Sequence, residues 1–121
     1  MNVEIGIDRE NRDGIELVAL AGELDIATAP RVERELGDAF DATRRGLVLD
    51  LTDLSYFDST GINLFAHTSR RAEMLGIKLA VVSPAPHLRR LIDLSGMSNV
   101  LALRESRAAA LEYVLQGRPA A

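Results

Sequence analysis

The chain has 121 residues, 47% of them apolar and 26% charged, so we expect one compact domain over residues 1–121. It contains no cysteine and only two histidines, which excludes disulfides, thiol nucleophiles and a thiolate or histidine-rich metal site. The formal net charge is −4 and the basic pairs lie apart, which argues against nucleic-acid binding. No apolar run approaches the roughly 18 residues that span a bilayer, and the N-terminus lacks a signal-peptide pattern. We therefore expect a cytoplasmic protein with no membrane contact.

The first third of the chain predicts a β-hairpin followed by a helix. Apolar residues alternate over Val3–Ile7, Asn11–Gly14 has turn composition, and Ile15–Leu20 forms a second strand. A helix is predicted to begin with a cap near Thr28, with Pro30 in its first turn. Its apolar stripe is Val32, Leu36, Ala39 and Phe40.

The rest of the chain predicts three strand–helix units. The strands are Leu47–Leu51, Ile77–Val82 and Val100–Leu103, and the helices run from Asp58 to Leu75, from Ser83 to before Gly96, and from Ser106 to Gln116. The side chains predicted to face inward from these helices are Leu64, Phe65, Thr68, Ala72 and Leu75; Leu88, Leu91 and Leu94; and Ala108, Leu111 and Leu115.

This order, β-β-α-β-α-β-α-β-α, predicts an α/β fold with a small mixed sheet flanked by about four helices. The opening hairpin supplies the antiparallel part and the strand–helix units supply the parallel part. Ligand sites in such folds lie where strands give way to helices, which here means Leu24–Thr28, Phe57–Gly61 and Ser83–Pro86.

The sequence does not indicate an enzyme. Ser59 lacks the G-x-S-x-G context of a nucleophile, and neither a P-loop nor a dinucleotide-binding motif is present. His67 would lie about two helical turns beyond Ser59 with its ring outward, and His87 would face solvent in a first turn. We expect neither catalysis nor a cofactor.

The tetrapeptide Asp58–Gly61 carries the most information, and it has two interpretations. Asp, Ser and Thr are ordinary helix caps, and Gly eases a tight strand-to-helix turn. Alternatively, hydroxyls at a helix N-terminus are accessible, and the unpaired N–H groups there favour a phosphate. A phosphate added beside Asp58 would concentrate negative charge.

Residues around the first strand–helix junction also have two interpretations. Glu23 and Asp25 form either a solvated acidic loop with a capping role or a binding surface. Ile26, apolar at a loop-to-helix junction, is typical of a core residue, whereas Ile62 lies slightly off the inward stripe of its helix and is a candidate contact residue.

Three ordered segments resemble the STAS domain family, and within it the bacterial anti-sigma-factor antagonists. They are Gly22–Asp25 with Thr28-Ala29, Leu49–Leu51 with Phe57–Gly61, and Val82–Pro84 with Arg90, Leu91, Asp93, Ser95 and Gly96. Each segment alone is a weak signal, but three in order at suitable spacing are a strong one. The resemblance covers roughly Val3 to Val114 and agrees with the element order predicted above.

The resemblance implies regulation of transcription by partner switching. In that family the unphosphorylated antagonist binds an anti-sigma factor that is a serine kinase, which frees the sigma factor. The kinase phosphorylates the serine after the Asp with ATP, and a serine phosphatase reverses the step. By position Ser59 is the acceptor, although Thr60 is a second hydroxyl beside it, and Asp25 matches the acidic position near the kinase. The residues expected to contact the partner are Glu23, Asp25, Ile26, Thr28, Asp58, Thr60, Gly61 and Ile62.

Two other functions remain open from the sequence. A STAS domain can be a subunit of another assembly, such as a sensory complex or a lipid transporter. The same helix N-terminus could instead hold a small ligand or nucleotide.

Overall fold

A computed structural model gives the fold over residues 5–116. The elements follow the predicted order, with one additional 3-10 turn, and so confirm the α/β class. They are β1 (Ile5–Arg12), β2 (Ile15–Leu24), α1 (Ala29–Ala42), β3 (Gly46–Phe57), α2 (Ser59–Leu75), β4 (Leu79–Val82), α3 (Pro86–Leu94), the 3-10 turn η1 (Met97–Asn99), β5 (Leu103–Arg104) and α4 (Arg107–Gln116). Val3 and Glu4 of the first predicted strand lie outside the described residues.

The sheet has the strand order β1-β2-β3-β4-β5, in which only the β1–β2 pair is antiparallel. β3 is much longer than predicted, because it continues beyond Leu51 to Phe57 and pairs with β2 along its length. The register shifts twice along this pair, between Ala19 and Ala21 and between Gly22 and Glu23. Leu24 nevertheless ends opposite Phe57, so the segments that follow the two strands leave the sheet side by side.

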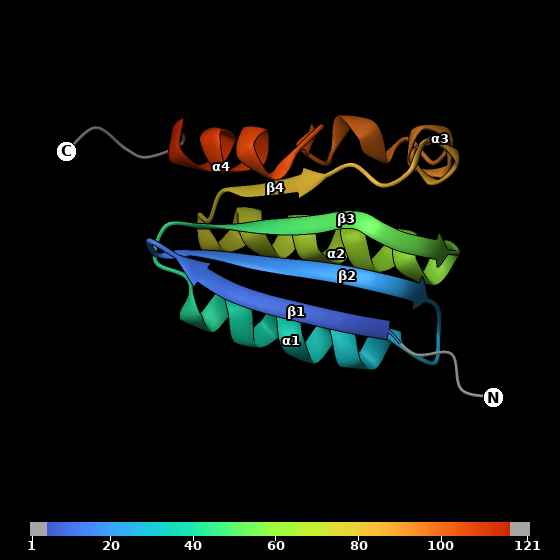
Figure 1. Ribbon diagram of the computed structural model, residues 1–121, viewed down its shortest axis with the longest axis horizontal. Coiled ribbons are helices and arrows are strands. Elements are labelled where there is room, and N and C mark those ends of the chain that lie inside the picture. Colours follow the sequence, from blue (N-terminus) through green and yellow to red (C-terminus); the bar gives the residue numbers. More distant parts are fainter. Residues whose placement is uncertain (1–4, 117–121) are drawn as a thin grey trace.

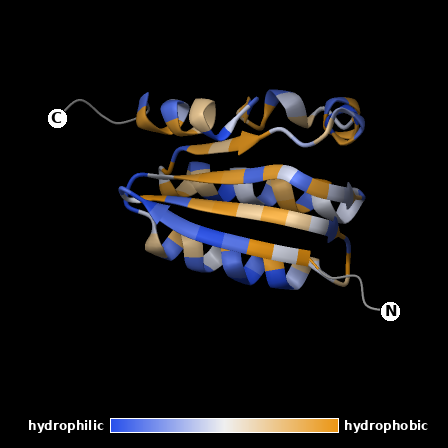
Figure 2. Cartoon of the chain, in the orientation of Figure 1, coloured by the Kyte–Doolittle hydropathy of each residue, from blue (hydrophilic) through white to orange (hydrophobic). Residues whose placement is uncertain are grey.

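Helices cover both faces of the sheet, as Figure 1 shows, with α1 and α2 together on one face and α4 on the other. The larger core lies under α1 and α2 and also takes up Leu88 and Ile92 from α3. There the Phe57 and Phe65 rings pack edge to face with centroids 5.3 Å apart, and complete burial of each such ring contributes about 1.5–3 kcal/mol. The smaller core joins the sheet to Ala110 and Val114 of α4. Figure 2 shows the apolar residues of β3 and β4 running between these layers.

Some predicted inward faces are wrong at the ends of helices. On α3, Leu91 and Leu94 are 42% and 74% exposed, and the buried pair is Leu88 and Ile92. On α4, Ala110 and Val114 are buried and the predicted Leu111 packs partly buried against the smaller core, whereas the predicted Ala108 and Leu115 are exposed. Leu75, at the end of α2, is 53% exposed. Both short helices cover a narrow part of the sheet, so each buries a single i, i+4 pair rather than a full stripe.

Candidate functional site

Two strand–helix junctions meet at one edge of the sheet. Because Leu24 pairs with Phe57, the loop between β2 and α1 lies beside the start of α2. Both helices run back from this edge along the same face (Figure 1). The structure thus brings the predicted residues from Glu23 to Thr28 and from Asp58 to Ile62 to the same end of the sheet, where Thr28 and Gly61 are buried and the other predicted contact residues are at least partly exposed.

Ser59 is the first residue of α2, and its side chain is exposed, as predicted. Asp58 caps the helix, because its Oδ1 accepts a hydrogen bond from the Thr60 N–H at 2.9 Å. Within residues 5–116 no side chain or backbone group hydrogen-bonds the Ser59 hydroxyl. The cap role therefore falls to Asp58, and the Ser59 hydroxyl is left free to react.

Gly61 allows the start of α2 to pack closely against the sheet. A Cβ at this position would lie 2.8 Å from Phe57 Cβ and 3.2 Å from Leu24 Cδ2, closer than atoms can approach without displacement. Glycine here lets the first turn of α2 pack directly on the ends of β2 and β3. Ile62 is half-buried and packs against the larger core, so only part of it remains for a partner.

Asp25 organises the first loop. Its Oδ1 accepts hydrogen bonds from the backbone N–H groups of Ala27 (2.9 Å) and Thr28 (3.2 Å). The Thr28 hydroxyl is buried, donates to the Glu23 carbonyl at 2.8 Å and accepts from the Asp25 N–H at 3.0 Å. Thr28 stands at the N-cap position, but its side chain does not cap α1, so that part of the prediction is wrong. The hydroxyl is turned back to close the loop instead.

Ile26 projects from this loop into solvent with 81% of its surface exposed, so its interpretation as a core residue is wrong. The cause is the turn itself: Asp25 and Thr28 bond to each other across it, which leaves the residue between them pointing outward. Beside Ile26, between the first turns of α1 and α2, lies a hollow of about 290 Å³ lined also by Ala29 and Thr60. An exposed apolar side chain next to a hollow is typical of a binding surface.

Three carboxylates lie around Tyr56, at the end of the sheet where α2 begins, and form what we term the acidic cluster, Glu23, Asp25 and Asp58. All three act on Tyr56, which precedes them on β3 and lies opposite Glu23. The pKa of Tyr56 is raised, first by the negative charge of Asp58 and then by partial burial and the charges of Asp25 and Glu23. Tyr56 is 44% exposed and was missed by the sequence reasoning, because the strand that carries it was predicted to end at Leu51.

Of the remaining candidates, His67 also lines the hollow beside Ile26. At the third junction the Ser83 hydroxyl accepts a hydrogen bond from Arg89 at 3.0 Å, and Arg89 pairs with Asp93 on the same helix. His67 and His87 are both exposed, on α2 and α3, as predicted. In the part of the chain that the structure describes, no group of three or more His, Cys, Asp or Glu side chains could hold a metal ion.

Comparison with known proteins identifies the family. Residues 6–110 match the STAS domain family. The chain is 32% identical over 106 residues to the anti-sigma-B factor antagonist of Listeria monocytogenes, covering 86% of this chain and 90% of that protein. It is 29% identical over 112 residues to the anti-sigma F factor antagonist of Paenibacillus polymyxa, covering 92% and 94% of the two chains. The crystal structure of an anti-sigma factor antagonist from Mycobacterium paratuberculosis superposes with a TM-score of 0.82 at 28% identity, covering 93% and 95%.

The chain therefore belongs to the STAS domain family, as the resemblance predicted. The relatives that it matches over most of their length are regulatory proteins named as antagonists of anti-sigma factors. Among residues 5–116, no helix combines the length and apolar character that crossing a membrane requires.

Proposed function

We propose that this protein is an anti-sigma-factor antagonist that is switched by phosphorylation of Ser59 and acts without catalysis of its own. The observation that carries the proposal is the free, exposed hydroxyl of Ser59 at the start of α2, with a hydrogen-bonded Asp58 before it and the acidic cluster at the same end of the sheet. The partner would be an anti-sigma factor with serine-kinase activity, and a serine phosphatase would restore the starting form. We place this action in the cytoplasm.

The position of Ser59 explains why phosphorylation would control binding. A kinase must bring the acceptor hydroxyl against the γ-phosphate of ATP, so Ser59 has to lie inside the interface between the two proteins. After transfer, a group of about −1.5 to −2 charges stands at that place. The phosphate on Ser59 would be repelled by the phosphates of the product ADP, and it would also have to be desolvated in the interface. Both effects weaken the complex in its phosphorylated form.

The surface next to Ser59 fits such a partner. Ile26 and Tyr56 supply exposed apolar area, and the acidic cluster supplies charge. Tyrosine and exposed aliphatic residues within a polar rim are common in protein interfaces. The matching surface of the partner would have basic residues at its rim and apolar pockets that accept Ile26 and Tyr56.

The test is the affinity of the purified chain for a candidate anti-sigma kinase, measured by calorimetry with ADP present. Ser59→Ala should bind as tightly as the natural chain, because it removes the acceptor and adds no charge. Ser59→Asp should bind at least tenfold more weakly, a difference of about 1.4 kcal/mol. Equal binding by Ser59→Ala and Ser59→Asp would contradict the charge switch.

A further inference from the structure

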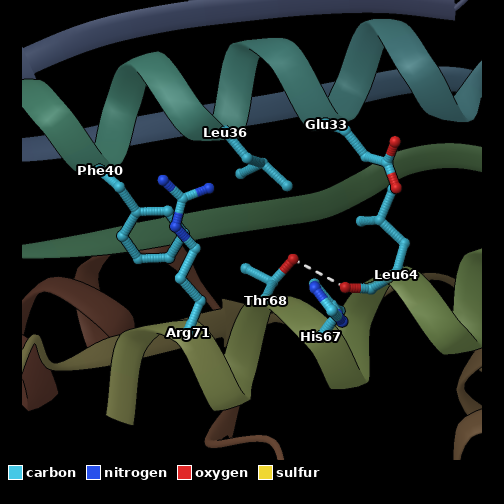
Figure 3. A pocket seen from close by; sticks show the side chains of 7 residues that line it. All are labelled: Glu33, Leu36, Phe40, Leu64, His67, Thr68 and Arg71. Atoms are coloured by element: carbon cyan, nitrogen blue, oxygen red, sulfur yellow. Dashed lines mark hydrogen bonds between the residues drawn. The ribbon is translucent and has the colours of Figure 1, made fainter. Parts of the chain in front are cut away.

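Two further hollows differ in what their walls offer to a ligand. Figure 3 shows the one between α1 and α2, of about 230 Å³, where the Leu64 carbonyl already accepts a hydrogen bond from the Thr68 hydroxyl at 2.7 Å. The other, of about 460 Å³, lies at the start of β4, at the end of the sheet away from Ser59, and we call it the β4 hollow. Its lining residues come from four parts of the chain: Ser69, Ala72 and Glu73 of α2; Ile77, Lys78 and Leu79 at the start of β4; Asn99, Val100 and Ala102 before β5; and Tyr113 of α4.

The edge of β4 is unpaired where it borders the β4 hollow, because β5 pairs only with the last two residues of β4. On the β3 side, the Lys78 carbonyl accepts the N–H of Leu47. On the β5 side, the Val81 N–H donates to the carbonyl of Ala102. Backbone groups alternate between the two edges of a strand, so the N–H and C=O of Leu79 point away from β3 and toward the hollow. Among residues 5–116, neither of these two groups has a hydrogen-bond partner.

Two cations lie on the side of the β4 hollow that faces α4. Leu79 packs against the larger core under α2, so the side chain of Lys78 points to the opposite face of the sheet. There the Lys78 ammonium lies 4.5 Å from the centre of the Tyr113 ring, and the Arg104 guanidinium lies 4.3 Å from it. The aromatic ring attracts both cations and holds them beside the hollow.

Carboxylates near the β4 hollow do not cancel this positive charge. Glu105 and Glu112, which follow Arg104 and precede Tyr113 in the chain, are both exposed, and Glu105 lies 3.7 Å from Arg89. Among the lining residues the one carboxylate is Glu73, on the α2 side. That side otherwise offers the apolar surface of Ala72 and Ile77. The α4 side of the hollow is therefore basic and the α2 side is largely apolar.

A free N–H and a free C=O on the same residue are what an added strand needs for pairing. A peptide laid along this edge would accept from the Leu79 N–H and donate to the Leu79 carbonyl. Its side chains would point alternately toward the apolar α2 side and toward the cations on the α4 side. From this match of backbone and charge we propose that the β4 hollow binds an extended segment of a partner protein, in which apolar side chains alternate with acidic ones. The segment extends the sheet along β4, ahead of β5.

The test is an NMR titration of the isotope-labelled chain with the capped peptide Ac-Val-Glu-Val-Glu-Val-NH2. A few exposed hydrogen bonds and one charge pair give a weak complex, with a Kd on the order of 1 mM. The amide signals of Leu79 and Val100 should shift and saturate, whereas those of Ser59 and Thr60 should not. The same peptide with N-methylated amides should bind about fivefold more weakly, because it cannot donate to the Leu79 carbonyl. Ac-Val-Lys-Val-Lys-Val-NH2 should lose about as much, because its lysines would face two cations.

Variants of the chain test the same contact from the other side. Lys78→Gln should weaken binding of the glutamate peptide about fivefold, and Lys78→Arg should restore it. Arg90→Gln, the same loss of charge at an exposed position of α3, should leave binding unchanged. No saturable shift at Leu79 up to about 10 mM peptide, equal binding of the N-methylated or the lysine peptide, or binding unaffected by Lys78→Gln would each overturn the proposal. These measurements need no kinase, so their outcome is independent of the role of Ser59.

Discussion

At the residue scale, the neighbours of Ser59 have separable structural and recognition roles, and Asp25 shows this best. Its Oδ1 holds the N–H groups of Ala27 and Thr28, so Asp25→Ala should destabilise the fold by about 1 kcal/mol. Asp25→Asn keeps an oxygen at the same place and removes the charge, so stability should change by less than about 0.5 kcal/mol. Chemical denaturation compares the two variants. If Asp25→Asn proved as unstable as Asp25→Ala, the negative charge of Asp25, and not its hydrogen bonds alone, would stabilise the loop.

The same pair of variants tests recognition. If the acidic cluster contributes to the interface, both should bind the kinase more weakly than the natural chain, by a similar factor. Binding lost only in Asp25→Ala would assign the effect to the shape of the loop rather than to its charge.

At the scale of the element, the start of α2 depends on the close approach that Gly61 permits. Gly61→Ala would force its Cβ against Phe57 and Leu24, and we expect a loss of about 1–3 kcal/mol. Gly37→Ala is the matched control, since it lies in α1 with its nearest neighbour, an atom of Arg71, at 3.7 Å. Alanine there should be stabilising by about 0.5–1 kcal/mol. Thermal unfolding of both variants decides, and a harmless Gly61→Ala would contradict the packing described here.

Elements also show what the sequence could and could not predict. The order of strands and helices, the cap at Asp58 and the exposure of Ser59 follow from local patterns that survive in the fold. The second half of β3 was missed because β3 carries an extra residue at each of the two register shifts against β2, which leaves Leu51, Leu54 and Phe57 buried at every third position, a spacing that is not typical of a strand. Which side chains of α3 are buried depends on where the helix packs against the sheet, and the sequence of the helix alone does not determine that position.

Some residues of the candidate site could not be predicted from the sequence either. Ile26 was read as core because hydrophobic residues are usually buried, yet a hydrogen-bonded turn exposes it. Tyr56 could be recognised only once β3 was known to extend to Phe57. The hollow beside Ile26 could not be predicted either, because it requires the first turns of α1 and α2 to be placed side by side.

At the scale of the whole molecule, one buried carboxylate links stability to pH. Asp50 is 7% exposed, and although burial raises its pKa, hydrogen bonds from Thr52 and Arg107 outweigh that effect and set the pKa below its usual value. Its contribution is therefore complete above the unfolded-state pKa of about 4 and is lost as the pH falls below it. Arg107 comes from α4 and Asp50 from β3, so this pair ties the last helix to the sheet.

We expect Asp50→Asn to lower the free energy of unfolding by about 1–2 kcal/mol at pH 7 and to leave the variant less sensitive to acid than the natural chain. Denaturation from pH 7 down to about pH 3 measures both quantities. A variant with unchanged stability at pH 7, or with the same loss on acidification, would show that Asp50 is not the linked group.

The most direct test of the central claim is where phosphate is placed when the chain is incubated with ATP and its kinase. Mass spectrometry of the natural chain, Ser59→Ala and Thr60→Ala locates it. The account predicts one phosphate on Ser59, none on Ser59→Ala, and full incorporation in Thr60→Ala, whose cap donor to Asp58 is a backbone N–H and survives the change. Phosphate on Thr60, or undiminished incorporation in Ser59→Ala, would contradict it.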